Sequence, residues 1–318
     1  MGFLNGRNKG IAAALMSAFF LGLAPVFGKQ AISSGFVPLA VVALRTSIAA
    51  VLLLIIIAAF KRPFLYIFPV GLIGCVLAGA VNGIGSILYY MALGRLDASM
   101  GQLLYSLYPL FVALWLILDQ QAPTRLTMLR IGLAAVGVFL LVFAEEANVD
   151  PLGVAMMIGA SALYALHLPI NQRVLYEIPA PTVTLYTLLA MSAVVVPAYL
   201  IFDFQWPTNP DVNWGAIAGL TLVTFASRLT LFLGVKHLGG MQTALLGLAE
   251  LLVTILFSIV LLGEMLTPFQ IVGAVVLGIS LLLVALDKAP PTARKKGGWL
   301  GWIRPPAPPT IPWDALRE

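Results

Sequence analysis

The sequence predicts an all-α membrane protein of ten transmembrane helices, arranged as two inverted five-helix repeats. The prediction rests on the composition, the spacing of the apolar segments and a repeat between the two halves of the chain. Of the 318 residues, 61% are hydrophobic and 10% are charged, whereas soluble domains average about half apolar and a quarter charged residues. One soluble chain cannot bury that much apolar surface, so we expect lipid to cover a large part of it.

Apolar segments of membrane-spanning length recur along the chain. A helix needs about 20 mostly apolar residues to cross the hydrocarbon core. The predicted spans are 10–31, 37–60, 68–93, 98–118, 126–144, 151–172, 179–202, 214–236, 240–262 and 267–286. We expect residues 10–144 to form the first repeat, residues 151–286 the second, and residues 287–318 a Pro-rich basic tail that is disordered or lies on the surface.

The distribution of Lys and Arg predicts the orientation of these spans, because positively charged loops stay in the cytoplasm. With ten spans and the N-terminus inside, most basic residues, such as Lys61, Arg62 and Lys236, fall on the inner side, and only Lys29 and Arg95 fall outside. We therefore expect a multi-pass protein of a bacterial or archaeal plasma membrane with both termini and the tail in the cytoplasm. The same bias explains the basic pI without nucleic-acid binding.

The two halves of the chain share residues at constant spacing. The pairs at an offset of 144 are Ser17 and Ser161, Ala18 and Ala162, Pro25 and Pro169, and Lys29 and Arg173; those at an offset of 141 are Gly132 and Gly273, and Gly137 and Gly278. Because five is odd, a tandem copy enters the membrane in the opposite sense, which gives an inverted repeat. This symmetry is typical of alternating access, in which the halves exchange conformations and so open the protein to one side and then the other.

Ionisable groups inside a span are costly and mark candidate functional sites. Four fall in the predicted spans: Arg45, His167, Arg228 and Glu250. Arg228 and Glu250 have similar predicted depths, which favours a direct or near ion pair; the pair either takes part in proton coupling or only joins two helices. Arg45 either attracts a carboxylate or extends outward to the interface. His167 either relays a proton or makes an interhelical hydrogen bond.

A set of polar side chains suits a cavity that holds a small organic solute. Its members are Asn82, Ser86, Tyr105, Tyr108, Ser161, Tyr164 and Thr224. Aromatic rings with hydroxyl tips bind an amphipathic solute by stacking and a few hydrogen bonds. For any single Tyr the alternative is helix packing or an interfacial belt, which we favour for Tyr89 and Tyr90.

Short motifs in both halves resemble the EamA type of the drug/metabolite transporter superfamily. They are Pro25-Val26-Phe27-Gly28-Lys29, Pro38-Leu39-Ala40 with Arg45, Tyr90-Met91-Ala92-Leu93 with Asp97-Ala98, Ala249-Glu250-Leu251-Leu252, and Gly263-Glu264-Met265-Leu266-Thr267 with Gln270 and Gly273. The ninth helix departs from the family's Leu-Glu-Pro-Leu element, while the fourth keeps Pro109-Leu110. The resemblance covers residues 10–286. It implies a basket of helices around a central cavity and the secondary active transport, in the export direction, of a small organic metabolite such as an amino acid.

Other functions remain as alternatives to metabolite export. The resemblance equally covers a cationic drug or multidrug exporter. An intramembrane enzyme would need a motif such as His-Glu-x-x-His or Gly-x-Ser-x-Gly, and a channel would need a filter loop or rings of like residues. Transport driven by ATP would need a phosphate-binding loop. The sequence shows none of these features. We expect no enzyme activity, no cofactor and no metal. The expected partners are a small-molecule substrate, membrane lipid and a proton or counter-substrate, without nucleic acid, for a monomer or homodimer.

The ten-span arrangement predicts where tags become accessible. A tag at Ala147, between the fifth and sixth spans, is expected outside the cell, and a tag after Thr292 is expected in the cytoplasm, because five spans separate the two positions. Labelling of intact and permeabilised cells with a membrane-impermeant reagent measures this. Two tags on the same side would show that the ten-span inverted arrangement is wrong.

Overall fold

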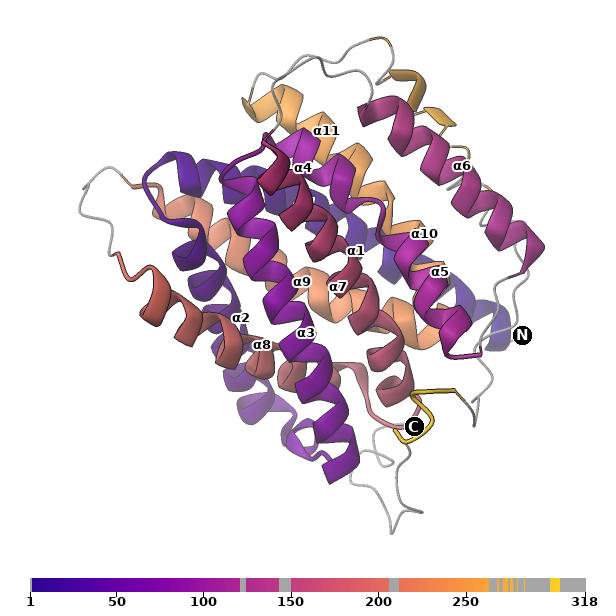
Figure 1. The fold of residues 1–318 in the computed structure, drawn as a ribbon. Coiled ribbons are helices and arrows are strands. Elements are labelled where there is room, and N and C mark those ends of the chain that lie inside the picture. The colour runs from indigo at the N-terminus through magenta and orange to yellow at the C-terminus, as the bar shows by residue number, and fades with distance from the viewer. Residues whose placement is uncertain are drawn as a thin grey trace.

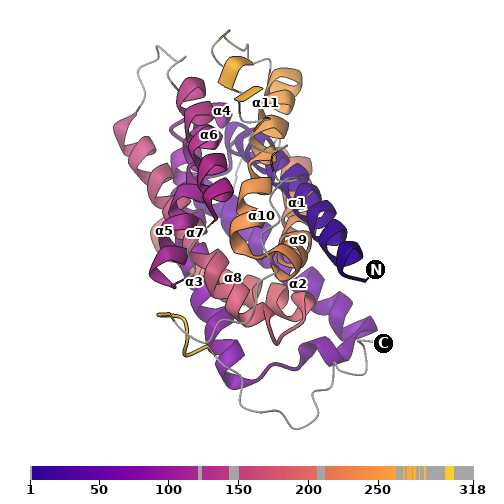
Figure 2. The same cartoon turned by 90° about the vertical axis from the view of Figure 1, so that its right-hand side faces the viewer.

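The computed structural model describes residues 2–120, 124–142, 150–205, 212–262 and 298–303, with isolated positions between 268 and 283. Every extended regular element within these residues is helical (Figures 1 and 2). The elements are α1 (Gly2–Ser33), α2 (Pro38–Phe60), η1 (Arg62–Leu65), α3 (Pro69–Leu93), α4 (Ala98–Tyr105), α5 (Tyr108–Leu118), α6 (Arg125–Val142), α7 (Pro151–Leu175), α8 (Ala180–Phe202), α9 (Trp214–Leu238), α10 (Gly240–Gly247) and α11 (Ala249–Leu262).

Prolines and polar caps determine where several helices begin and end. Pro38, Pro69 and Pro151 occupy the first turns of α2, α3 and α7, where a missing amide hydrogen costs no helical bond. The Asp150 carboxylate caps α7 by accepting a hydrogen bond at 2.9 Å from the amide two residues later. Gly239 ends α9 with a φ of 85°, a conformation that glycine adopts without steric cost.

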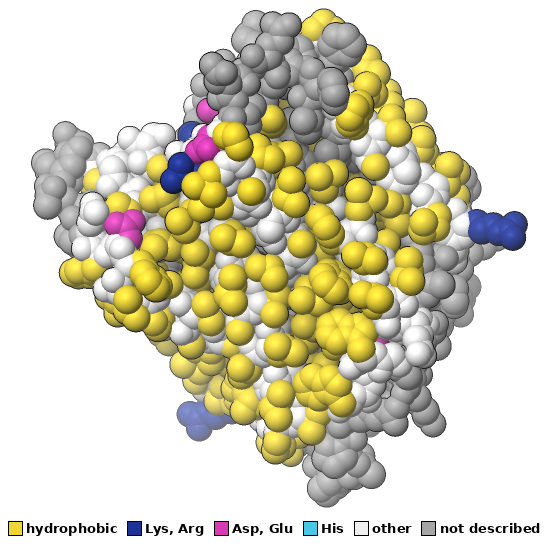
Figure 3. All heavy atoms as spheres, in the orientation of Figure 1, with side chains coloured by type: hydrophobic (Ala, Val, Ile, Leu, Met, Phe, Trp, Pro, Cys, Tyr) yellow, Lys and Arg dark blue, Asp and Glu magenta, His cyan; other side chains and the backbone are white. Residues whose placement is uncertain are grey.

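Within the described residues, seven helices are long and apolar enough to cross a membrane: α1, α2, α3, α7, α8, α9 and the run of α10 and α11. Hydrophobic side chains cover much of the face in Figure 3, and large apolar residues such as Ile55, Phe60 and Leu222 are exposed. Lipid tails cover such a surface in a multi-pass membrane protein.

Three of the ten predicted spans are not among these seven. Span 98–118 is interrupted, span 126–144 corresponds to α6, and more than half of span 267–286 lies outside the described residues. The count of ten therefore stays a prediction. Of the predicted tail 287–318, the structure describes residues 298–303, in which Leu300 and Ile303 are buried and Trp299 and Trp302 are exposed.

The long helices pack in a pattern that recurs when the two halves of the chain are exchanged. α1 packs along α9, α3 packs along α7, and α2 packs against α8. In the predicted repeat, α1, α2 and α3 of the first half correspond to α7, α8 and α9 of the second. Exchanging the halves then turns the contact of α1 with α9 into the contact of α7 with α3. The contact of α2 with α8 is unchanged by the exchange. The two halves are therefore interlocked, and neither forms a separate bundle.

Glycines allow α3 to pack closely between α7 and α8. A Cβ on Gly79 would lie 2.6 Å from the Cβ of Ala190 in α8, and one on Gly83 would lie 3.1 Å from the Cβ of Val194. Gly85 comes equally close to α7. The Gly-x-x-x-Gly spacing of Gly79 and Gly83 thus serves helix packing, because small residues let backbones approach without a gap.

Spans 98–118 and 240–262 are interrupted at matching positions of the two halves. The first is divided into α4 and α5, and the second into α10 and α11. α5 packs against α10, and α4 packs against α11, so the two interrupted helices are neighbours. Each interruption leaves a backbone carbonyl without its helical partner inside the bundle, and such a carbonyl needs a donor from the protein.

Pro109 causes the first interruption. It has no amide hydrogen, and its ring collides with the carbonyl four residues earlier when the helix continues. That carbonyl belongs to Tyr105, and it accepts a hydrogen bond from the Ser161 hydroxyl of α7 at 2.9 Å. Ser161, which we predicted for the cavity, therefore binds a backbone carbonyl of α4.

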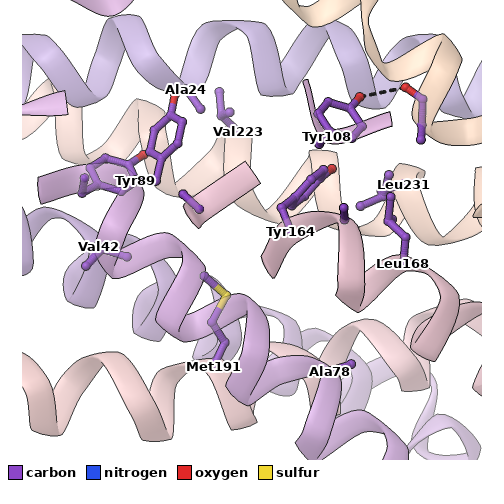
Figure 4. Packing of buried hydrophobic residues seen from close by; sticks show 14 of the residues in the cluster. Ala24, Val42, Ala78, Tyr89, Tyr108, Tyr164, Leu168, Met191, Val223 and Leu231 are labelled. Carbon is purple, nitrogen blue, oxygen red and sulfur yellow. Dashed lines mark hydrogen bonds between the residues drawn. The ribbon is translucent and has the colours of Figure 1, made fainter. Parts of the chain in front are cut away.

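Tyr108 fills the second interruption, which contains no proline. Its hydroxyl donates to the Ala244 carbonyl at 2.9 Å (Figure 4). Gly247 leaves room for that hydroxyl, because a Cβ at this position would collide with it. Tyr108 was also predicted for the cavity, but it is 1% exposed and packs between the interrupted helices.

We expect Gly247→Ala to lower the free energy of unfolding by about 1–3 kcal/mol, the usual cost of forcing a methyl group into a packed core. Adding Tyr108→Phe should recover part of the loss, because phenylalanine lacks the oxygen that collides. Gly132→Ala is the matched control, since no atom of the described residues lies within 4 Å of an added Cβ there. Thermal unfolding of the purified variants measures the effect, and equal melting temperatures for both alanine variants would contradict this packing.

Candidate functional site

A cavity lies among α1, α2, α3, α4, α7, α9 and α11, so both halves of the chain contribute to it. Its lining consists of Leu21, Ala24, Arg45, Gly85, Ser86, Tyr89, Tyr90, Gln102, Tyr105, Tyr164, Arg228 and Glu250. The empty space within it, together with the open solvent at its mouth, is about 430 Å³. Of the predicted site residues, those in the lining are Arg45, Ser86, Tyr105, Tyr164, Arg228 and Glu250.

Arg45 of α2 is turned into the bundle and is 6% exposed. Its Nη1 donates to the Thr224 hydroxyl at 3.1 Å and its Nη2 to the Ser86 hydroxyl at 3.4 Å. The guanidinium carbon lies 4.7 Å from the centroid of the Tyr90 ring, in cation–π contact. Nε has no partner among the described residues. Arg45 therefore points a free donor into the bundle and does not extend to the interface.

Arg228 of α9 is held by neutral partners. In the amide orientation that satisfies both groups, Asn82 Oδ1 accepts from Nη1 at 3.2 Å and from Nη2 at 2.9 Å. Nη1 also lies 3.4 Å from Nε2 of His167, and the Tyr164 ring lies beneath the guanidinium at 5.8 Å. Asn82 therefore lies outside the cavity lining and holds the Arg228 guanidinium in place through these two hydrogen bonds.

His167 is hydrogen-bonded through both of its ring nitrogens, and the bond of Nε2 reaches a second helix. Nδ1 is hydrogen-bonded to the backbone carbonyl of Tyr164, one turn earlier in α7. A carbonyl only accepts, so Nδ1 carries the proton and Nε2 is the acceptor that faces Arg228. The ring is fully buried and is not part of the cavity lining. This geometry is that of an interhelical hydrogen bond.

Glu250, in the first turn of α11, is 1% exposed. Its carboxylate is hydrogen-bonded to Gln102 of α4, and Gln102 Oε1 accepts from the Tyr89 hydroxyl at 3.1 Å. The oxygen Oε1 of Glu250 has no partner among the described residues. Glu250 and Arg228 line the same cavity, but within the described part of the chain no ion pair of 4.0 Å or less joins them.

Tyrosine rings form a connected row beside these charged groups. The ring centroids of Tyr89 and Tyr105 are 4.9 Å apart, those of Tyr105 and Tyr164 5.2 Å, and those of Tyr164 and Tyr108 5.0 Å. Figure 4 shows Tyr108 and Tyr164 beside each other. Edge-to-face rings pack firmly and leave hydroxyls and ring faces along one side of the cavity.

The cavity contains three polar residues that the prediction of the site left out: Tyr89, Tyr90 and Gln102. Gln102 is an amide in an apolar span, and the cost of burying an amide without a partner is the signal that could have identified it. The two tyrosines lie near one end of α3, which made them resemble interfacial residues. Among the described residues, no group of three or more His, Cys, Asp or Glu is placed to hold a metal ion.

The remaining predicted residue, Thr224, lies behind the lining. Its hydroxyl accepts from Arg45 and donates to the Leu220 carbonyl at 2.8 Å. Thr224, Asn82 and His167 therefore orient the two arginines, whereas Ser161 and Tyr108 bind backbone carbonyls.

Comparison with known proteins identifies the family. The model of the EamA-like transporter family matches residues 8–143 and again residues 151–286. Similar curated proteins are the uncharacterized transporter sll1319 of Synechocystis sp., 25% identical over 66% of this chain, and the uncharacterized transporter YwfM of Bacillus subtilis, 27% identical over 54%. The matched regions span 65% and 58% of those relatives.

A solved crystal structure of a protein that is 16% identical has the same fold, with a TM-score of 0.70 over 88% of this chain and 96% of that one. The family model covers most of the chain, and it does so twice, once in each half. The chain therefore belongs to the EamA-like transporter family.

Proposed function

We propose that this protein is a secondary transporter that carries a small organic solute through the cavity by alternating access. The observation that carries the proposal is that Arg45 and Glu250 line one cavity, and that each has a buried atom, Nε and Oε1, without a partner among the described residues. A buried polar atom without a partner costs about 1–3 kcal/mol. A solute that accepts a hydrogen bond from Arg45 and donates one to Glu250 removes both costs.

A solute with a carboxylate and an ammonium group fits this cavity. The carboxylate is bound by Arg45 and the ammonium group by Glu250, and the apolar part of the solute stacks on the tyrosine row. An amino acid or a related solute has these groups. A cationic drug fits less well, because the lining contains two guanidinium groups and a single carboxylate.

The interlocked packing of the two halves supports the mechanism. Since the main helix contacts recur when the halves are exchanged, an exchange of their conformations changes which side of the cavity is open. The proposal includes ten spans in two inverted repeats, 10–144 and 151–286, and cytoplasmic termini. Export is the proposed direction, following what the resemblance of the sequence motifs implies.

Glu250 is the proposed coupling residue. It is the one carboxylate in the cavity lining, and the described residues give it no ion-pair partner. A charged carboxylate without a counter-ion is costly inside a membrane. Binding of a proton or of the ammonium group of a solute removes that cost, so the two compete for one site, which is the requirement for proton exchange.

We expect Glu250→Gln to abolish uptake driven by a pH gradient and to leave folded yield unchanged, because the amide keeps the hydrogen bond to Gln102 but cannot release a proton. Initial uptake of radiolabelled amino acids into proteoliposomes, with and without a pH gradient, measures this. Glu177→Gln is the matched control, since Glu177 follows α7 outside the cavity. Wild-type gradient-driven uptake in Glu250→Gln would leave Glu250 as a residue that only joins helices.

We expect Arg45→Gln to weaken binding of carboxylate-bearing solutes by about 1.5–3 kcal/mol, the worth of a hydrogen bond to a charged group, which is about a tenfold to hundredfold higher Kd. Arg95→Gln is the control, because Arg95 pairs with Asp150 at the helix ends. The measurement is thermal stabilisation of the purified protein by the L-amino acids, by their methyl esters and by the cationic dye ethidium.

The panel also separates the candidate functions. Stabilisation by ethidium and by the esters, without an effect of the free amino acids, would overturn the proposed substrate class and favour a drug exporter. Counterflow in proteoliposomes separates the classes of protein: saturable counterflow indicates a carrier, unsaturable leakage a channel, and a covalently changed solute an enzyme.

A further inference from the structure

The segment Gly298–Ile303, which we call the strap, is folded against the end of the bundle where α5 and α7 finish. Figure 1 shows it as a short yellow segment beside the C label. Leu300 is fully buried and Ile303 is 7% exposed, and both belong to the main hydrophobic core. The outward side chain of Trp302 is 49% exposed. Part of the strap thus enters the core while part faces outward.

A buried ion pair anchors the strap. Asp119 follows the last turn of α5 and is 0% exposed. Its Oδ2 accepts from Nε and Nη2 of Arg173 at 3.1 and 2.7 Å, and its Oδ1 accepts from the amide of Leu300 at 3.1 Å. The pair joins α5 of the first half to α7 of the second. The strap therefore completes the hydrogen bonding of a charge that bridges both halves.

The apolar contacts of the strap extend to a third helix. The Trp299 ring lies 6.5 Å from that of Trp115 in α5. Ile303 comes within 3.7 Å of the point where a Cβ of Gly74 in α3 would lie, and Val174 of α7 comes within 2.6 Å of the same point. The strap thus covers the place where α3 and α7 meet most closely at this end.

Gly298 is required by its backbone conformation and by its neighbour. Its φ is 86°, in the left-handed region that favours glycine. A Cβ at this position would also collide with Asp119. Any other residue at position 298 therefore strains the start of the strap against the anchor.

The two ends of the bundle contain ion pairs that differ in burial. At the strap end, α5 and α7 are joined by the buried pair of Asp119 and Arg173, whose side chains are 0% and 3% exposed. At the opposite end, α3 and α7 are joined by Arg95 and Asp150, which are 45% and 33% exposed. Exposed pairs contribute about 0–1 kcal/mol, whereas breaking a buried pair costs about 3–5 kcal/mol.

The strap lies beyond the cavity along α3 and α7, two of the helices that line it. Along α3, Gly74 is about 16 Å from Gly85 in the cavity lining, at 1.5 Å per residue. Along α7, Arg173 is about 14 Å from Tyr164 by the same measure. A solute in the cavity that leaves toward this end passes between helices that the strap holds together.

We propose that the strap is a lock: it keeps α3, α5 and α7 together at this end, and it must detach before the cavity opens there. Its residues come from neither repeat, so it adds control to one side of an otherwise symmetric arrangement. The lock does not depend on which solute the cavity takes.

The test uses the full chain in lipid nanodiscs, where both faces are accessible, with Cys75→Ser as the background. Val174→Cys reports opening between α3 and α7 at the strap end, because Val174 is 2% exposed. We expect Leu300→Asp to raise the rate at which a water-soluble maleimide labels this reporter by about tenfold, equivalent to 1.4 kcal/mol. Trp302→Asp, with the same new charge at an exposed position, should leave the rate unchanged.

A second reporter separates a lock from general loosening. Leu96→Cys lies near the opposite end, where Leu96 is 4% exposed and contacts the Gly153 position of α7, and its labelling should not change with either strap variant. If Leu300→Asp fails to fold, Gly298→Ala replaces it, with Trp302→Ala as its control. Equal labelling of Val174→Cys in strap and control variants, or equal acceleration of both reporters, would overturn the proposal. Neither readout involves a solute, so failure of the proposed substrate class leaves this test intact.

Discussion

Backbone carbonyls that lose their helical partner inside a bilayer must find a donor within the protein, because hydrocarbon offers none. Tyr105 and Ala244 carry such carbonyls, and the hydroxyls of Ser161 and Tyr108 serve them. Ser161 comes from the second half and Tyr108 from the first, so each bond crosses between the halves. Glu250 and Tyr105 lie directly beside the interruptions. The positions of the Glu250 carboxylate and the Tyr105 ring in the cavity therefore depend on these two hydrogen bonds.

Helix ends were predictable where the sequence has strong local signals. Spans 37–60, 68–93 and 179–202 agree with α2, α3 and α8 to within one residue at each end, because a proline or a polar segment follows each apolar run. The roles predicted for the charged residues of the cavity stay predictions. Arg45, Arg228 and Glu250 face one cavity, since buried ionisable groups need polar surroundings.

The hydrogen-bond partners of the site residues were not predictable. The depth of a residue along its helix does not show how the helix is rotated about its axis, so it does not show which neighbour the side chain faces. Arg228 and Glu250 have similar depths, yet Arg228 binds Asn82 and His167 and not the carboxylate. Ser161 is polar, as a cavity residue would be, but its hydroxyl donates a hydrogen bond to the Tyr105 carbonyl. That carbonyl lacks its helical partner only because the helix is interrupted, which the structure shows. The strap escaped prediction as well, since its composition resembles a disordered tail and its apolar residues find partners only at the assembled ends of three helices.

The anchoring of the strap also has a consequence for how the protein is made. Synthesis runs from the N-terminus, and segments made early fold first, so α3, α5 and α7 emerge from the ribosome well before residues 298–303. Until then Asp119 and Arg173 have each other but lack the amide of Leu300, and the apolar surface around Gly74 is uncovered. The newly made protein therefore passes through a stage in which this end lacks the strap, and synthesis of residues 298–303 ends that stage.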